Sequence, residues 1–286
     1  MAKTPNALKE SRSDKIYYAI VYVILTIVLL AVAYPLYFVV ISSFSDPSAV
    51  SRGEAILFPK GFTMEGYVTV FQNNEVVRGF INSLIYTFTG TALSIAVTIP
   101  AAYALSRPDL RGKGVITAFF MITMYISGGM IPTYLVVKGL HMIDTIWAII
   151  VPGCLSVYNM IVAMSFFRSN LPMELLEAAK VDGCSNTRFF FKIAVPLSGA
   201  IIAIMVLYYG VGLWNSYFSA LIYITTRSKW PLQLVLRTIL VLSAQQMQNI
   251  KDVKELQRMQ MVAELMKYSL IIISSVPILF VYPFIQ

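Results

Sequence analysis

Few side chains in this sequence are suited to acid–base, nucleophilic or metal chemistry. The chain has one histidine, His141, and two cysteines, Cys154 and Cys184. A metal centre or a Ser-His-Asp arrangement needs several such groups in one place, which a single histidine does not supply. The sequence G-x-x-x-x-G-K-[ST], which cradles the phosphates of ATP, is absent. We therefore expect no catalytic residue, no metal site and no cofactor on this chain.

A polar segment from Glu174 to Gly183, between two long apolar stretches, is the strongest candidate for a functional surface. Asn170 can cap a short helix here, and Pro172 fits its first turn. Glu174 and Glu177 lie in the N-terminal half of that helix, where the helix dipole favours negative charge. Gly183 can end the helix in a left-handed turn.

A second short helix, Arg188 to Ile193, is expected after this turn. Its cap can come from Ser185, Asn186 or Thr187, it presents Phe189, Phe190 and Phe191, and Pro196 marks the restart into the next apolar stretch. Two short helices that meet at a glycine form a compact, partly apolar knob suited to a groove on a partner. The alternative is an amphipathic linker that lies on the membrane surface.

The elements that position this segment are membrane spans. Apolar residues make up 58% of the chain, charged residues 13%, and the mean hydropathy is +0.73, far outside the soluble range. Six stretches lack charged residues and approach or exceed the roughly 20 residues that cross a bilayer. They are 16–45, 79–106, 114–137, 145–167, 193–226 and 268–286. We expect an all-α, polytopic membrane protein with about six transmembrane helices, the first of which is too long for a cleaved signal peptide.

Basic residues indicate the orientation of these spans. The tail 1–15 and the segment 170–197 are rich in Lys and Arg, which favours the cytosolic side for both. The segments 46–78 and 227–267 are then outer loops, although the second carries seven basic residues and runs against the rule. The rest of the chain, 16–286, forms a transmembrane domain whose core spans about 77–286. The net charge of +8 reflects this topology and contact with anionic lipids, so nucleic acid is not an expected partner.

The segment also carries a family resemblance. Glu177-Ala178-Ala179, followed by Asp182, Gly183, Ile193 and Pro196, resembles the "EAA" signature of permease subunits of bacterial binding-protein-dependent ABC importers, and Phe190 lies within the same segment. The whole chain is similar to the carbohydrate branch, in particular to the second permease of maltose-type and oligosaccharide-type systems. Three further motifs carry this resemblance: Asn82-Ser83, the run from Pro100 to Arg107, and the run from Trp214 to Phe218. Relatives usually continue into a short cytosolic tail, whereas this sequence ends at Gln286.

The resemblance implies a type I ABC importer permease in the bacterial cytoplasmic membrane, with its N-terminus in the cytosol. It implies a second permease, two ATPase domains that bind ATP and Mg, an external solute-binding protein, and a carbohydrate substrate, expected to be an oligosaccharide. The segment 170–197 would be the coupling loop that contacts the ATPase.

A sugar path needs hydrogen-bonding groups and flat apolar faces, and the later spans carry both. The candidate path residues are Tyr158, Asn159, Trp214, Asn215 and Tyr217. The i, i+3 spacing places Trp214 and Tyr217 on one helix face. The alternative is that the amides bond neighbouring helices and the aromatics fill the core. Gly128, Gly129 and Pro132, with Gly210 and Gly212, are expected at bends or close helix contacts.

Other function classes are less well supported. An ABC importer for a different small polar solute remains an alternative. A secondary transporter or channel would need intramembrane charge or a repeated half, and the sequence shows neither. A membrane enzyme would need a catalytic cluster near an interface.

Overall fold

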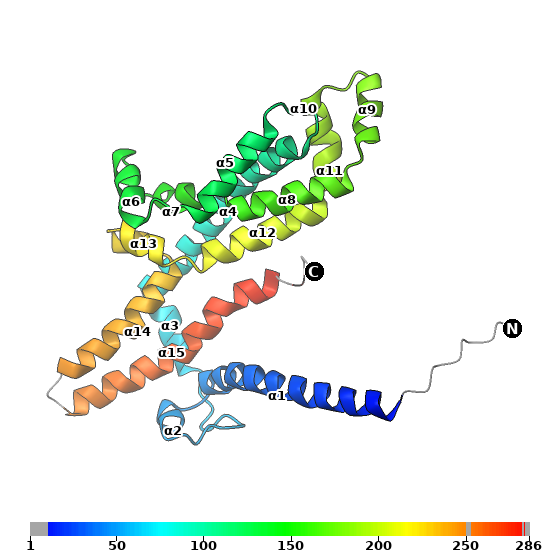
Figure 1. Cartoon of the computed structure of the whole chain (residues 1–286). Helices are drawn as coiled ribbons and strands as arrows, with labels where there is room; N and C mark the ends of the chain where they lie inside the picture. Colours follow the sequence, from blue (N-terminus) through cyan, green and yellow to red (C-terminus); the bar gives the residue numbers. More distant parts are fainter. Residues whose placement is uncertain (1–10, 250–252, 282, 284–286) are drawn as a thin grey trace.

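The computed structural model describes residues 11–249, 253–281 and 283, and these residues form helices without a β-strand. In chain order the helices are α1 (Arg12–Ser43), α2 (Pro47–Ser51), α3 (Glu65–Gln72), α4 (Asn74–Ser106), α5 (Lys113–Tyr125), α6 (Met130–Gly139), α7 (Trp147–Ile150), η1 (Val151–Gly153), α8 (Val157–Asn170), α9 (Met173–Val181), α10 (Asn186–Phe189), η2 (Phe190–Ala194), α11 (Val195–Leu197), α12 (Gly199–Trp214), α13 (Phe218–Tyr223), η3 (Arg227–Lys229), α14 (Leu232–Asn249) and α15 (Val253–Val281). Figure 1 shows α4, α5, α8 and α12 side by side in one bundle, with α9 and α10 at one end of it and α6 and α13 at the other.

The helices are long and apolar enough for a membrane protein. By length and composition α1 and α4 each cross a bilayer, with 32 and 33 residues. Three bent pairs, α5 with α6, α7–η1 with α8, and α10–α11 with α12, give up to five spans among the described residues. The last predicted stretch, 268–286, falls mostly on the shorter apolar part of α15, Met266–Phe280. Residues 282 and 284–286 of that stretch lie outside the described residues.

Two of the predicted spans are broken at residues that interrupt a helix. The axis turns by 116° between α5 and α6, where Gly129 takes a left-handed φ of 84°, so the bend expected at Gly128 and Gly129 is confirmed. In the stretch 193–226 the axis turns by 78° between α11 and α12, two residues after Pro196, which agrees with the restart expected at this proline. Proline has no N–H to donate and disrupts the helical ladder at such positions.

Helix α4 is the centre of the bundle and packs against α8, α12 and α14. A buried hydrogen-bonded chain joins three of these helices at mid-height. The hydroxyls of Thr98 and Tyr209 lie 2.7 Å apart, and the Tyr209 oxygen accepts the backbone N–H of Ser156 at 3.1 Å. In an apolar interior such polar groups need partners, so this chain fixes the rotation of α12 relative to α4 and α8.

The outer part of α4 holds the connection between α13 and α14. Asn82 donates to the carbonyls of Ser228 and Trp230, at 2.9 and 3.0 Å. Ser83 accepts the backbone N–H of Leu232 at 2.8 Å, and the Tyr86 hydroxyl donates to the carbonyl of Lys229. The three side chains lie at i, i+1 and i+4 of one helix and satisfy backbone groups that no helix pairs.

A second attachment of the same connection comes from Asp144, which has a left-handed φ of 60°. Its carboxylate accepts the backbone N–H groups of Thr225 and Thr226 at 3.0 and 2.9 Å, and the ammonium of Lys229 at 2.7 Å. The bond from Lys229, followed by those from Thr226 and Thr225, holds the pKa of Asp144 well below its usual range. The loops that follow α6 and α13 are therefore fastened to each other.

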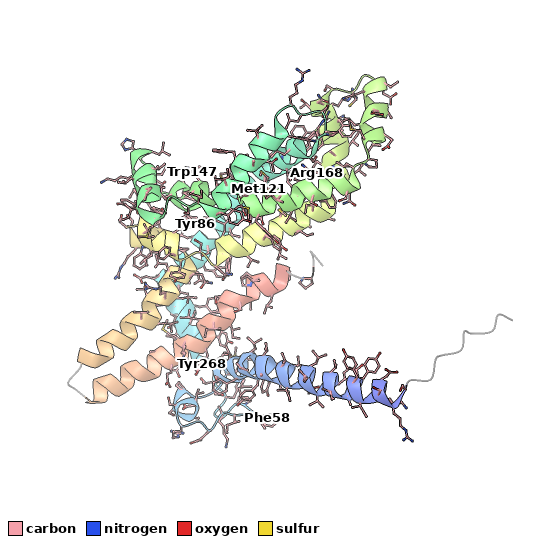
Figure 2. The ribbon with its side chains drawn as sticks, viewed as in Figure 1. Phe58, Tyr86, Met121, Trp147, Arg168 and Tyr268 are labelled. Carbon is pink, nitrogen blue, oxygen red and sulfur yellow. The ribbon has the colours of Figure 1, made fainter. Side chains whose placement is uncertain are left out.

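Helix α1 lies at the edge of the molecule, beside α15 (Figure 1). None of its most apolar 18-residue window is buried. Its C-terminal half is attached to the rest of the protein: Phe38 packs edge-on against Tyr268, the hydroxyls of Tyr34 and Tyr37 donate to carbonyls of Ile56 and Leu57, and Ile41, Ser42 and Ser43 are buried. Figure 2 shows Tyr268 at this crossing of α15 and α1.

The close approach of α4 and α14 depends on Gly79. A Cβ added there would lie 3.1 Å from Val235 Cγ2 and 3.3 Å from the backbone Cα of Leu232. We predict that Gly79→Val lowers the free energy of unfolding by about 1–3 kcal/mol relative to Gly114→Val, because overpacking against a backbone cannot relax. Gly114 is also helical and would meet nothing within 4 Å, so both variants share the change in helix propensity. Thermal unfolding in detergent measures the difference, and equal stabilities would contradict the prediction.

Candidate functional site

Helix α9 is amphipathic and attaches to the bundle through its apolar side. Leu176 and Ala179 are buried in the same core as residues of α4, α8 and α12. The helix begins after Pro172, which is its N-cap residue and gives no side-chain cap. The expectation that Asn170 caps α9 is wrong, because α8 extends to Asn170 and its amide donates back to the carbonyl of Phe166.

The turn after α9 has the predicted form. Gly183 takes a φ of 72°, and its N–H donates to the carbonyl of Lys180 at 3.0 Å. The N–H of Cys184 reaches back to the carbonyl of Ala179 at 2.8 Å, which closes the helix end. Of the three proposed caps, Ser185 is the one used, since its hydroxyl accepts the N–H of Arg188 at 3.3 Å. The two helices are therefore held at a fixed angle.

The second helix continues as α10, a π-helical turn η2 and α11, and so extends beyond the predicted end at Ile193. The expectation that it presents three phenylalanines outward is wrong for two of them. Phe189 and Phe190 are buried against Tyr103 of α4, with the Phe190 ring centroid 5.0 Å from that of Tyr103. Phe191 is exposed. A π-turn shifts the side-chain register relative to an α-helix, which a period of 3.6 does not anticipate.

The outward side of α9 offers a continuous strip. Glu174, Glu177, Ala178 and Val181 are exposed and follow the spacing i, i+3, i+4 and i+7, so they share one face. Val181 is 88% exposed. Ala179 faces the bundle and so does not lie on this strip. Val181 was not among the predicted residues, although the same helical spacing from Glu174 would have found it.

The remaining predicted residues of the segment divide between the two sides. Asp182, Gly183 and Pro196 are exposed, Ile193 is half-buried, and Phe190 is buried. The predicted signature therefore contains exposed residues, which are free to contact a partner, and buried residues, which hold the segment to the bundle.

An ion-pair relay ties α9 to the connection after α4. Arg107 donates to both carboxylate oxygens of Asp109, at 2.8 and 2.5 Å, and also to the hydroxyl of Tyr103. The bonds from Arg107 lower the pKa of the Asp109 carboxyl to about 2, so it stays ionised at neutral pH. Lys180 of α9 lies 3.6 Å from the same carboxylate. These pairs are partly exposed and each adds little stability, but they fix the direction of α9.

A cavity of about 210 Å³ lies beneath α9. It is bordered by the C-terminal ends of α4 and α8, where Arg168 donates to the carbonyl of Leu105 at 3.3 Å. Figure 2 places Arg168 at the α9 end of the bundle, opposite Tyr86 and Trp147. The end of the protein that carries the exposed strip is therefore opposite the end fastened by Asp144.

The five candidate path residues have different surroundings: Asn159 and Trp214 are buried, whereas Tyr158, Asn215 and Tyr217 are exposed. Trp214 is 3% exposed, and its indole N–H donates to the carbonyl of Ser274 at 2.9 Å. The expectation that Trp214 and Tyr217 share a helix face is wrong, because α12 ends at Trp214 and Tyr217 is the N-cap residue of α13. Asn215 and Tyr217 are exposed, and the Asn215 amide donates to the carbonyl of Val211 at 3.0 Å.

The other two candidates lie in the first turn of α8. Tyr158 is exposed and Asn159 is buried, so they point to different surroundings. The glycines expected at close contacts also differ from each other. A Cβ on Gly210 would lie 3.7 Å from the Thr91 hydroxyl, whereas one on Gly212 would meet nothing within 4 Å.

Comparison with known proteins identifies the class. No protein-family model matches the chain. It is 39% identical to Protein LplC of Bacillus subtilis over 252 residues, which cover 88% of this chain and 84% of that protein. It is 36% identical to the polygalacturonan/rhamnogalacturonan transport system permease protein YtcP of the same organism, over 96% of this chain and 94% of that protein. A solved structure, a bacterial ABC transporter involved in the import of the acidic polysaccharide alginate, has a TM-score of 0.88, 28% identity, and coverage of 98% and 99%.

The fold and these relatives define an integral membrane permease of an ATP-driven importer, with the type I fold expected from the sequence. The chain belongs to the family of carbohydrate ABC transporter permeases. It is a transport subunit that moves a carbohydrate across the membrane and not an enzyme.

Trp214 and Asn215 were each expected either to line a sugar path or to hold helices together, and their surroundings in the structure differ. We predict that Trp214→Ala lowers the free energy of unfolding by about 3–5 kcal/mol, because it empties a core site and orphans the Ser274 carbonyl. Asn215→Ala should change it by less than about 0.5 kcal/mol, because the side chain is exposed and bonds only within its own helix. Thermal unfolding of the purified protein in detergent measures both. A large loss of stability in Asn215→Ala would show that this amide ties helices together.

Proposed function

We propose that the segment 170–197 is the coupling loop of this permease, and that the strip Glu174, Glu177, Ala178 and Val181 docks in a groove of a separate ATPase chain. The observation that carries this proposal is Val181, an apolar side chain 88% exposed on a helix whose other face is firmly attached. An amphipathic helix that only lay on the lipid surface would not require the glycine turn, the serine cap and the ion pairs that fix the position of α9. An exposed apolar anchor flanked by carboxylates suits helix-in-groove recognition.

The remaining parts of the importer follow from the same proposal. ATP and Mg are bound by two ATPase domains on other chains, and a solute-binding protein delivers the substrate on the outer side. A second permease lies beside this one, and lipids or that permease cover the exposed apolar window of α1. The protein resides in the bacterial cytoplasmic membrane.

The mechanism follows from how α9 is attached. Closure of the ATPases on ATP moves the docked strip. Leu176 and Ala179 share a core with α4, α8 and α12, so that displacement is transmitted to the bundle rather than absorbed by a flexible loop. The bundle then alternates between inward-facing and outward-facing arrangements.

The substrate is an oligosaccharide. One relative is named for polygalacturonan and rhamnogalacturonan transport, another for arabinooligosaccharides, and the solved structure for alginate import. Two of these names denote polymers of acidic sugars, which makes an acidic oligosaccharide the favoured substrate.

The coupling proposal predicts that Gly183→Val reduces sugar-stimulated ATPase activity of the assembled importer on the order of tenfold. A β-branched residue at a φ of 72° is strained by about 1–3 kcal/mol, which misdirects α9. Gly53→Val is the matched control, because Gly53 has a φ of 71°, nothing within 4 Å of an added Cβ, and a place in the outer loop 46–78. Gly183→Asn should be nearly silent, since asparagine tolerates this conformation. Full stimulation in Gly183→Val at normal membrane levels would refute the role.

The proposed orientation predicts the labelling of three single cysteines introduced after Cys154 and Cys184 are replaced by serine. Cysteines at Ser13 and Asn186 should react with an impermeant maleimide only in inside-out vesicles, and one at Ser228 only in intact cells. All three positions are exposed. Labelling of position 186 in intact cells would overturn the topology and the coupling role together, because the ATPase is cytosolic.

A further inference from the structure

Arg237 is a charged residue within an apolar helical stretch. The first part of α14, Leu232–Val241, is apolar. Its residues Leu232, Val235 and Leu236 are buried in a hydrophobic cluster that also contains Val76 of α4. Arg237 is exposed on the opposite side of the same turns. Arg237 lies in the predicted outer loop 227–267, outside the charge-free stretches predicted to span the membrane.

The guanidinium of Arg237 is held in place but not neutralised. Its Cζ lies 5.7 Å from the ring centroid of Tyr217, a cation–π arrangement. Two other arginines stack on rings in the described residues, and each has a carboxylate: Arg227, 3.7 Å from Glu75, and Arg107, 2.5 Å from Asp109. Arg237 has no ion-pair or hydrogen-bond partner among the described residues.

Two further groups suited to a sugar neighbour Arg237 and Tyr217 along their helices. Gln233 lies one turn earlier on the same side of α14, half-buried, and its amide makes no hydrogen bond to any described residue. Phe218 follows Tyr217, packs edge-on against it at 6.4 Å, and is exposed, which offers a flat apolar face. Amides bind sugar hydroxyls and aromatic faces bind the apolar face of a pyranose ring.

We propose that Arg237, oriented by Tyr217 and flanked by Gln233 and Phe218, is a subsite for the carboxylate of an acidic oligosaccharide, and that it sets the preference for uronate over neutral sugars. A planar guanidinium forms two parallel hydrogen bonds to a carboxylate, and stacking on Tyr217 fixes the plane in advance. The inference rests on the proposed function. Helix α14 begins near α13, at the end of the bundle opposite α9 (Figure 1), and the proposed topology has substrate enter on that side.

The test compares trigalacturonate with its methyl ester, which has the same sugar chain without the charge. Binding of each to the purified permease–ATPase complex in detergent is measured by calorimetry. Arg237→Gln should weaken binding of trigalacturonate by about tenfold or more and leave the ester unchanged, because a charge-assisted bidentate bond is lost. The affinity of Arg237→Lys for trigalacturonate should lie between those of the wild type and Arg237→Gln, since lysine keeps the charge but cannot donate two parallel hydrogen bonds from a planar group.

Arg227→Gln is the matched control, because Arg227 also stacks on an aromatic ring but already has a carboxylate partner; it should leave both affinities unchanged. Equal affinity of Arg237→Gln and the wild type for trigalacturonate, or equal losses for the acid and the ester, would overturn the inference. So would a wild-type complex that binds acid and ester equally while transporting carbohydrate. Failure of the complete importer to transport any carbohydrate in proteoliposomes would instead overturn the proposed function.

Discussion

The organisation of this permease depends on the apolar packing of the segment 170–197, the proposed coupling loop, into the membrane bundle. Leu176 and Ala179 from α9, with Phe189 and Phe190 from the following turns, belong to the same core as α4, α8 and α12. If the segment were connected to the spans only through its two ends, a force applied by a partner would bend its backbone. Because it shares their core, and well-packed interiors deform little, the loop and the bundle move as one body.

Helix α4 extends this rigidity along the molecule. Near the loop, the Tyr103 ring packs edge-on against Phe167 and at a tilt against Phe190, and Arg107 donates to Asp109. At the other end of the helix, Asn82 and Ser83 hold the connection into α14. The Asn82-Ser83 pair and the run from Pro100 to Arg107, which in the sequence are only signs of the family, thus share a physical role. Each motif packs against a connecting segment or forms hydrogen bonds to it, and so holds that segment in place. A single helix connects the proposed ATPase-facing end with the proposed substrate-facing end.

Much of this could be predicted from the sequence, and the failures have identifiable causes. Charge-free stretches locate the spans because burying charge in lipid is costly, and Gly183 is recognisable because few residues accept a left-handed turn. The inward direction of Phe189 and Phe190 could not be predicted, since it depends on a π-turn and on Tyr103, distant in sequence. The spacing of Trp214 and Tyr217 predicts one shared face because neither proline nor glycine stands between them. The helix nevertheless ends at Trp214, and the Asn215 side chain donates back to the carbonyl of Val211. Long-range packing, rather than local preference, decides these cases.

The isolation of α1 has a consequence for biogenesis. A helix that buries none of its apolar window against its own chain gains its stability from the bilayer, so it inserts and persists before the rest of the protein exists. The bundle around α4 has its own core and does not wait for α1 to fold. The attachment of α1 to the rest of the protein is confined to its C-terminal end, where Phe38 meets Tyr268, so it is completed only when α15, the last helix in the chain, has been made.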